Sequence, residues 1–395
     1  MNKANNQKSI IKKEEYLALD GSARASYRPV DPKYEHLPIF CKIFFALGGV
    51  ALILYIIMSL SADSADWFNQ NISTYIRFAL AAVTSILPFS LAEAIILTSP
   101  LLLFLILRYA VRTRCDTWRT VGVFILVLSS VVALFFSMFV FTFAAGYRGR
   151  TIDEKMELDK DNITAEELYA ISEEVASRAS ELAPGILYGD DGFSYMPYTV
   201  EEMNTKLIEA YGKVSESYSF IPNAYTRIKP VLLSEGLSQM HITGVYTFFT
   251  GESNLNVIFP DYTLPFTAAH ELAHQRGIAR EDEANFVAFL VCTASDDPYI
   301  QYCGYVNMYE YLASSLRSAD KELYRNVYGD LHPGIKGEFA AYSDFYDKYR
   351  DSVASDVSST INNAYLQSQG TAGTVSYGMV TRLAVGYFRK ASPMP

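Results

Sequence analysis

Three long apolar stretches lie in the first 150 residues, and polar and apolar residues are mixed over the rest of the chain. The first stretch, Ile43 to Ala62, carries no charged residue, and as a helix it spans about 30 Å, the thickness of a bilayer core. A third stretch, about 120–146, has the same character. Both segments are predicted to cross a membrane.

The second apolar stretch, 78–107, is interrupted by Pro88 and Pro100 and is too long for one straight span and too short for two. We predict an interfacial amphipathic segment over about 67–88, followed by a span over about 89–109. Glu93 stands near one end of this span, and we expect it to have an interfacial or helix-N-terminal role.

The distribution of lysine and arginine predicts the orientation of these spans. Residues 1–42 carry eight basic side chains, and the loop between the second and third spans carries four, whereas Arg77 is alone in the loop after the first span. Basic loops stay in the cytoplasm, so the tail 1–42 is expected to be cytoplasmic. The membrane region covers 43–147, and residues 148–395 are expected outside the cytoplasm of a multi-pass cell-membrane protein.

The part after residue 148 has the pattern of a mixed helical and strand domain. Thr164 and Glu167 are spaced as a capping box before a helix that places Leu168, Ile171, Val175 and Leu182 on one face. Short β-rich runs follow at 227–234, 242–250 and 254–259, and they predict a small antiparallel or mixed sheet. Four further helical stretches are expected at about 305–317, 337–352, 353–369 and 377–388.

Composition and charge narrow the class of protein. Half of the residues are apolar, and the net charge of −10 argues against a nucleic-acid partner, which would require a basic face. The four cysteines show no CxxC spacing, so a metal would need other ligands. Cys292 and Cys303 lie on the expected outer side, where either a disulfide or two free thiols is possible.

The sequence HELAH contains two of the five histidines. His270 and His274 are four residues apart, so on a helix both rings project from one face and can bind one cation. Glu271 follows the first histidine directly, where it can act as general base on a metal-activated water. This is the HExxH pattern of the zincins, and it predicts a catalytic Zn²⁺ site. The alternative is a solvated helix face with two histidines.

The third ligand is expected from the next helix. Arg280 occupies the position where a third histidine would follow in the longer HExxHxxGxxH pattern, which excludes that subclass. Gly277 predicts a helix stop, and Glu281, Asp282 and Glu283 stand at the start of the next helix. Glu281 is favoured over Glu283. His241 and His332 are the fallback ligands.

The pairing of HExxH with ExxAN is similar to the glutamate-ligand zincins, and this resemblance implies that Glu281 is the third ligand and that Asn285 supports a histidine. More narrowly, ITGVYTFFTGESN, LPFTAAHELAHQRGIAREDEANFVAFLVC, YVNMYEYL, NAYLQSQG and SYG follow a three-span anchor. This arrangement resembles an uncharacterised family of three-span bacterial membrane proteins classed as zinc peptidases, and it covers most of the chain after about residue 39.

Two further features of the site are predicted from neighbouring segments. The run Gly251 to Phe259 is a candidate edge strand that pairs with an extended substrate, although ordinary sheet packing is an equal alternative. Tyr377, His332 and Tyr302 are candidates to stabilise the oxyanion of the reaction.

The expected fold is therefore α+β, with a three-helix transmembrane region followed by a zincin-like metallopeptidase domain that is mostly helical. The expected function is that of a membrane-anchored zinc metallopeptidase with Glu271 as general base, acting on a peptide or protein at the cell envelope. The rival is a zinc-binding sensor or scaffold that signals across the membrane without turnover. The general base Glu271 favours the enzyme, because a protein that only binds has no chemical need of it.

Overall fold

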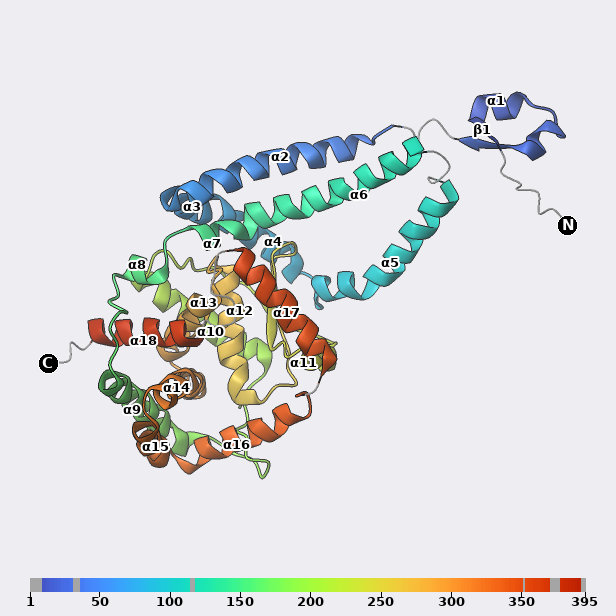
Figure 1. The fold of residues 1–395 in the computed structure, drawn as a ribbon. Helices are drawn as coiled ribbons and strands as arrows, with labels where there is room; N and C mark the ends of the chain where they lie inside the picture. Colours follow the sequence, from blue (N-terminus) through green and yellow to red (C-terminus); the bar gives the residue numbers. More distant parts are fainter. Residues whose placement is uncertain (1–8, 31–35, 114–117, 351, 370–376, 392–395) are drawn as a thin grey trace. The chain divides into compact units, whose positions relative to one another are not determined.

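The computed structural model describes residues 9–30, 36–113, 118–350, 352–369 and 377–391, and most of them are helical (Figure 1). The chain divides into two compact units. One unit comprises residues 1–56 and 94–140, and the other comprises 57–93 and 141–395. The predicted interfacial segment therefore belongs to the same compact unit as the part after residue 148.

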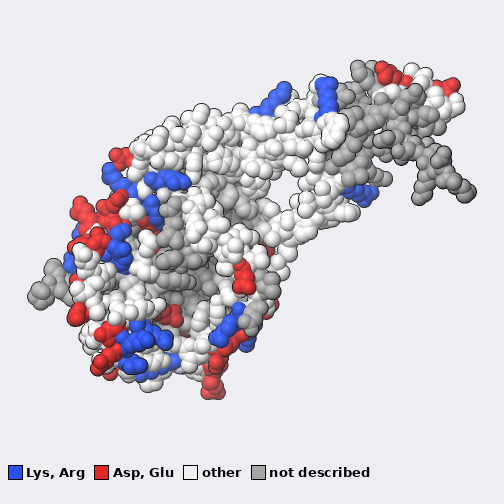
Figure 2. All heavy atoms as spheres, viewed as in Figure 1, with Lys and Arg blue, Asp and Glu red and all other residues white. Residues whose placement is uncertain are grey.

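Three helices are long and apolar enough to cross a membrane, which confirms three candidate spans. They are α2 (Ile39–Leu60), residues Leu91–Arg108 of α5 (Leu91–Thr113), and the helical stretch Trp118–Arg148, which begins with α6 (Trp118–Phe139). Helix α6 continues through a π-helical turn, η4 (Val140–Ala144), into α7 (Ala145–Arg148). Figure 2 shows few charged side chains along α2 and α6, whereas both signs of charge gather on the second unit.

The first unit also holds short elements within the predicted tail. Strands β1 (Ser9–Lys12) and β2 (Tyr27–Val30) pair in parallel, with α1 (Lys13–Ala18) and the 3-10 turn η1 (Ala23–Ser26) between them. In the second unit, the predicted interfacial segment is helical almost throughout, as α3 (Ala62–Phe68), the π-helical turn η3 (Asn69–Ser73) and α4 (Thr74–Ser85).

The sheet of the second unit is small and mixed, as predicted. Its order is β3 (Ile228–Pro230), β5 (Glu252–Leu255), β4 (Gly244–Thr247). β5 is parallel to β3 and antiparallel to β4, with Tyr246 opposite Ser253. Each strand is shorter than the run that predicted it, and all four residues of β5 are buried.

Helices make up most of the rest of this unit. Thr164 and Glu167 form the predicted capping box of α9, and Leu168, Ile171 and Val175 are buried. The longer helices are α9 (Ala165–Leu182), α10 (Val200–Ser217), α12 (Leu264–Gln275), α13 (Glu281–Ala294), α14 (Pro298–Ala319), α15 (Lys321–Asp330), α16 (Pro333–Asp347), α17 (Val353–Ser368) and α18 (Tyr377–Ala391). The shorter ones are α8 (Ile152–Met156), η5 (Ala183–Gly185), α11 (Ser234–Gln239) and η6 (Asp261–Thr263).

The core of the second unit surrounds α12 and α13, which lie side by side. Leu272, Phe286 and Val287 are fully buried. Arg276 is buried as well, with its guanidinium 3.8 Å from the centroid of the Tyr211 ring and hydrogen-bonded to the carbonyls of Leu272 and Ala224. These contacts explain how an arginine is accommodated immediately after the histidine helix.

Candidate metal centre

The histidine helix ends in a turn that brings the next helix back towards it. Helix α12 begins with a proline in its first turn, where the missing N–H costs nothing, and stops at Gly277, whose φ is +91°. The Gly277 amide donates to His274 O and the Ile278 amide to Ala273 O, which is the hydrogen-bond pattern of a Schellman turn. The predicted glycine stop is confirmed, and α13 starts four residues later at Glu281.

His270, His274 and Glu281 come together at this turn. One donor atom from each lies within 4.8 Å of the others, and among the described residues this is the group of three that could hold a metal ion. Glu281 Oε2 is 3.2 Å from His270 Nε2 and 3.5 Å from His274 Nε2. In a tetrahedral zinc site with bonds of about 2.0–2.1 Å, neighbouring donors are about 3.3 Å apart, and Glu281 Oε2 lies at about this spacing from both Nε2 atoms.

The other ring nitrogen of each histidine already has a partner. His274 Nδ1 is 2.7 Å from Ile278 O, and His270 Nδ1 is 2.9 Å from Asn285 Oδ1. Because these oxygens only accept hydrogen bonds, both Nδ1 atoms donate, and each neutral ring keeps its lone pair on Nε2, facing Glu281. Asn285 thus lies where the resemblance placed it, one turn after Glu281 on α13.

Charges in this cluster shift the pKa values of its members. Burial by itself lowers the pKa of His274, but the Glu281 carboxylate outweighs it and raises this pKa to about 9. Burial raises the pKa of Glu281, and the two histidines overcome that effect, so its pKa lies well below the usual range. Without a cation, His274 holds a proton against Glu281, and a divalent cation would take the place of that proton.

Glu271 faces the same region from α12. Its side chain is 5 % exposed, and Oε2 is buried with no hydrogen-bond partner among the described residues. Burial raises its pKa, against the lowering effect of His270 and His274. A buried carboxylate oxygen without a partner is costly, and at a reactive site it is the atom expected to receive a proton.

Glu283, the alternative third ligand, points elsewhere. Its carboxylate accepts a hydrogen bond from the Ile152 amide and pairs with Arg280 Nη1 at 3.2 Å. The two glutamates are two residues apart on α13, so their side chains leave the helix in different directions. The structure therefore groups Glu281, and not Glu283, with the histidines.

The strand beside the cluster differs from the one predicted. The run Gly251 to Phe259 forms β5, which is the buried middle strand, so the edge-strand prediction was wrong. The edge next to α12 is β4: the Tyr246 amide hydrogen-bonds to the Glu271 carboxylate, and a Cβ on Gly244 would lie 2.7 Å from Glu271 Oε1. Only glycine lets the strand pass this close to the carboxylate.

The other sequence candidates have different surroundings. His241 contacts Tyr349 O and the Tyr346 hydroxyl, and His332 caps α16 by accepting from the Gly334 amide. Tyr302 is buried, and its hydroxyl hydrogen-bonds with Glu338 and Tyr188. These three residues are outside the His–His–Glu cluster. The side chain of Tyr377 lies outside the described residues.

The cysteines and Glu93 also have clear positions. Cys292 and Cys303 are both buried free thiols, which decides the alternative left open by the sequence. Glu93 stands in the first turn of α5, as expected, and its carboxylate accepts hydrogen bonds from the amides of Leu232 and Leu233. It therefore holds the start of α5 against the loop before α11.

Two aromatic residues near the cluster were not predicted. Phe143 packs edge-on against His274, with ring centroids 5.7 Å apart. Tyr147 is buried and hydrogen-bonds to Tyr365 on α17. Both residues stand at the end of the third apolar stretch. The apolar composition of that stretch predicted a membrane span and did not indicate contacts with the His–His–Glu cluster. Tyr365 lies in NAYLQSQG, one of the segments that carried the resemblance.

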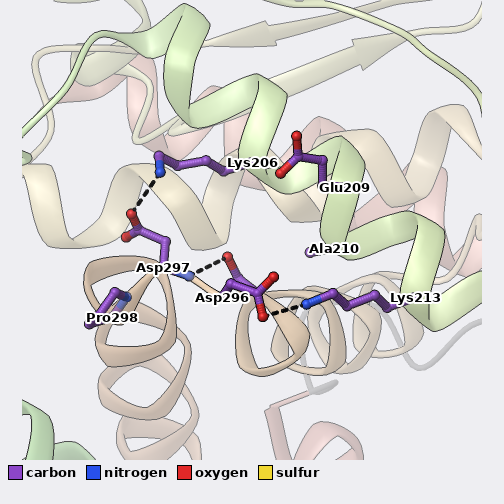
Figure 3. Close-up of a pocket in the computed structure, with 8 residues that line it drawn as sticks. Lys206, Glu209, Ala210, Lys213, Asp296, Asp297 and Pro298 are labelled. Carbon is purple, nitrogen blue, oxygen red and sulfur yellow. Dashed lines mark hydrogen bonds and ion pairs between the residues drawn. The ribbon is translucent and has the colours of Figure 1, made fainter.

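A pocket of about 140 Å³ lies elsewhere in this unit, between α10 and the turn before α14 (Figure 3). Lys206 pairs with Asp297 at 3.0 Å and Lys213 pairs with Asp296 at 2.6 Å. Asp297 also caps α14 by accepting from the Tyr299 and Ile300 amides. The two lysines and the two aspartates of this pocket are therefore occupied in holding α10 to the turn before α14.

The described structure is thus that of a membrane protein whose larger unit contains a His–His–Glu cluster on two adjacent helices. Residues 68–385 match the family described as "protein of unknown function (DUF3810)", and the match covers most of the chain, so the protein belongs to this family. Comparison with curated proteins and with solved structures found no match.

Proposed function

We propose that the protein is a membrane-anchored zinc-dependent peptidase of the glutamate-ligand zincin type. The observation that carries the proposal is the donor set: the Glu281 carboxylate oxygen lies 3.2 and 3.5 Å from the Nε2 atoms of His270 and His274, and the buried Oε2 of Glu271 has no hydrogen-bond partner in the described part of the chain. Two imidazoles and one carboxylate leave the fourth position of a zinc ion open, which is characteristic of a catalytic site rather than a structural one.

A zinc ion bound there would supply a Lewis acid and lower the pKa of a coordinated water to about 7. Glu271 takes a proton from the attacking water and delivers it to the amine nitrogen as the peptide C–N bond breaks. Asn285 and Ile278 O keep the two imidazoles in the tautomer that leaves Nε2 free. His270, His274 and Glu281 are the residues that would hold the metal.

Strand β4 supports a peptide as the substrate. It is the edge of the sheet and touches the base directly through Tyr246 and Gly244. An extended segment that adds to a sheet edge gains main-chain hydrogen bonds and brings its own carbonyl groups past the residues beside that edge. The lysine and arginine distribution supports an orientation with the cluster outside the cytoplasm, where the substrate would be a peptide or protein of the cell envelope.

The test uses the purified full chain in detergent, its zinc content and its cleavage of a fluorescently labelled unfolded protein. The unmutated chain should carry about one zinc, and Glu271→Gln should keep it but lose roughly 10²–10⁴ in rate, since only the proton acceptor is removed. His270→Ala should lose the metal. Glu338→Gln, which alters an equally buried glutamate on α16, is the matched control and should stay active.

Two outcomes would contradict the proposal. One is an unmutated chain without zinc under non-chelating conditions. The other is a Glu271→Gln variant that cleaves as fast as Glu338→Gln. Zinc binding without any cleavage would favour the sensor or scaffold.

A further inference from the structure

The polarity of α4 is reversed relative to a helix on the surface of a soluble protein. Its buried positions include Thr74, Arg77 and Thr84, and Arg77 is fully buried. Its exposed face is apolar: Tyr75 is 71 % exposed and Val83 is 66 % exposed. The exposed positions between residues 75 and 89 are all apolar, namely Tyr75, Ala79, Ala82, Val83, Ile86, Pro88 and Phe89. We call these side chains the α4 apolar face.

Arg77 fixes the polar side of α4 to the protein. Its five N–H groups donate to five neutral oxygens, so none of the buried donors is unsatisfied. Nε donates to Gln275 O at 2.9 Å, and Nη2 donates to Arg276 O at 3.3 Å and to the Thr74 hydroxyl at 2.9 Å. Nη1 donates to Thr142 O at 2.7 Å and to Asn69 Oδ1 at 2.8 Å.

Two of these oxygens belong to the end of the histidine helix. The carboxyl end of a helix carries partial negative charge and unpaired carbonyls, both of which suit a guanidinium. Gln275 is the last residue of α12 and directly follows His274. Arg77 thus joins α4 to the same turn that positions the His–His–Glu cluster, and a rotation of α4 that buried its apolar face would break the bonds to Gln275 O, Arg276 O and Thr142 O.

A buried ion pair fixes the segment after α4 in the same way. Lys229 Nζ and Glu252 Oε1 are 2.6 Å apart, and both side chains are almost fully buried. Lys229 also donates to Thr84 O and Phe89 O. Glu252 accepts from the Leu91 and Ala92 amides, at the start of α5. The backbone from 84 to 92 is therefore held from its polar side, with Ile86 and Phe89 pointing out.

Chain continuity identifies what covers the α4 apolar face. The membrane-length helix α2 ends at Leu60, shortly before α3 and α4, and the membrane-length helix α5 begins at Leu91, six residues after α4 ends. The segment that contains α4 is therefore connected at both ends to a helix that can cross the bilayer. Trp67 and Tyr75 are exposed aromatic residues, of the kind enriched at the membrane surface.

We propose that the α4 apolar face is embedded in the lipid surface, with α4 lying in the plane of the bilayer. Arg77, on the opposite side of the same helix, then ties the carboxyl end of α12 to that surface. The lipid contact and the metal cluster are joined by one rigid helix, independently of whether the cluster is catalytic.

The test places a single tryptophan in the full chain, reconstituted into vesicles whose lipids carry brominated acyl chains. Trp67 and Trp118 are first replaced by Phe, and Val83→Trp is compared with Leu187→Trp, an exposed position of the same unit. The emission of Trp at 83 should fall by roughly half or more, since a side chain about 5–10 Å below the membrane surface lies among the acyl chains. The emission of Trp at 187 should not change.

Acrylamide, a quencher dissolved in the water, shows whether water or a protein surface covers the face instead of lipid. If acrylamide and not the brominated lipid quenches Trp at 83, the face is in water and the proposal is wrong. If neither quenches it, a protein surface such as a second copy covers the face, and the proposal is equally wrong. Ile86→Trp provides the same comparison if Val83→Trp does not fold.

The link to α12 has its own measurement. Arg77→Lys keeps the charge but offers three donors instead of five. Hydrogen exchange of peptides that cover the end of α12 should then become at least roughly tenfold faster, while peptides from α14 should be unchanged. Unchanged exchange at the end of α12 would refute the coupling between α4 and the histidine helix.

Discussion

Asn285 offers a sharp test of the candidate metal centre, because it touches a proposed ligand without being one. Its side-chain oxygen is 2.9 Å from His270 Nδ1, whereas the partner of His274 is a backbone carbonyl that substitution cannot remove. A hydrogen bond of this kind contributes about 1 kcal/mol net, and loss of such a support typically costs roughly tenfold in metal affinity. Asn285→Ala should therefore bind zinc about tenfold more weakly.

Asn285→Asp should behave in the opposite way. A carboxylate at this position still accepts from Nδ1 and makes the imidazole a better electron donor, so the zinc affinity should be equal to that of the unmutated chain or up to roughly tenfold higher. The assay is competition between the purified full chain and a chromogenic zinc chelator at neutral pH. Thr293→Ala, which removes a hydroxyl bonded to Phe289 O on the same helix, is the control.

The reasoning would be refuted if Asn285→Ala bound zinc within about twofold of the unmutated chain while remaining folded, since a supported ligand should lose about tenfold. It would also fail if Asp at this position bound zinc more weakly than Ala.

Two further predictions concern the third ligand and the topology. Glu281→Gln should lower the zinc affinity far more than Glu283→Gln, because only Glu281 lies beside both histidines, and equal losses in chelator competition would contradict this assignment. In intact cells expressing a Cys115→Ser background, a membrane-impermeant thiol reagent should label Leu187→Cys and not His36→Cys, and the reverse pattern would place the cluster in the cytoplasm.

The arrangement of the two histidines and the turn after them could be predicted from the sequence, because it depends only on helix geometry. The spacing of His270 and His274 places both rings on one face of any helix, and Gly277 ends that helix. The position of Glu281 followed from the turn and from the ExxAN resemblance. The capping box formed by Thr199 and Glu202 is a local pattern of the same kind, and it could have predicted the start of α10.

The features that the sequence did not predict depend on distant segments. β5 has the sequence Glu252–Leu255, whose polar residues suggest an exposed edge, yet the strand is buried because Glu252 is neutralised by Lys229. Arg77 looks like a single loop charge until its distant partners are known, because Thr142 O is 65 residues and Gln275 O 198 residues away in the sequence. Pairings of this kind leave no periodic pattern in the sequence.

The division of the second unit between two stretches of chain has a consequence for how it is made. Gln275, which accepts from Arg77, is 198 residues later in the chain. At the usual 5–20 residues per second, a ribosome needs roughly 10–40 s after making Arg77 before that oxygen exists. In that interval two further apolar helices, α5 and α6, must be synthesised. A recombinant fragment that begins at residue 148 would lack α4 altogether, leaving the carbonyls of Gln275 and Arg276 without Arg77, and Glu252 without the Leu91 and Ala92 amides, although its ion pair with Lys229 remains. Production of the folded unit therefore requires the stretch 57–93 together with 141–395.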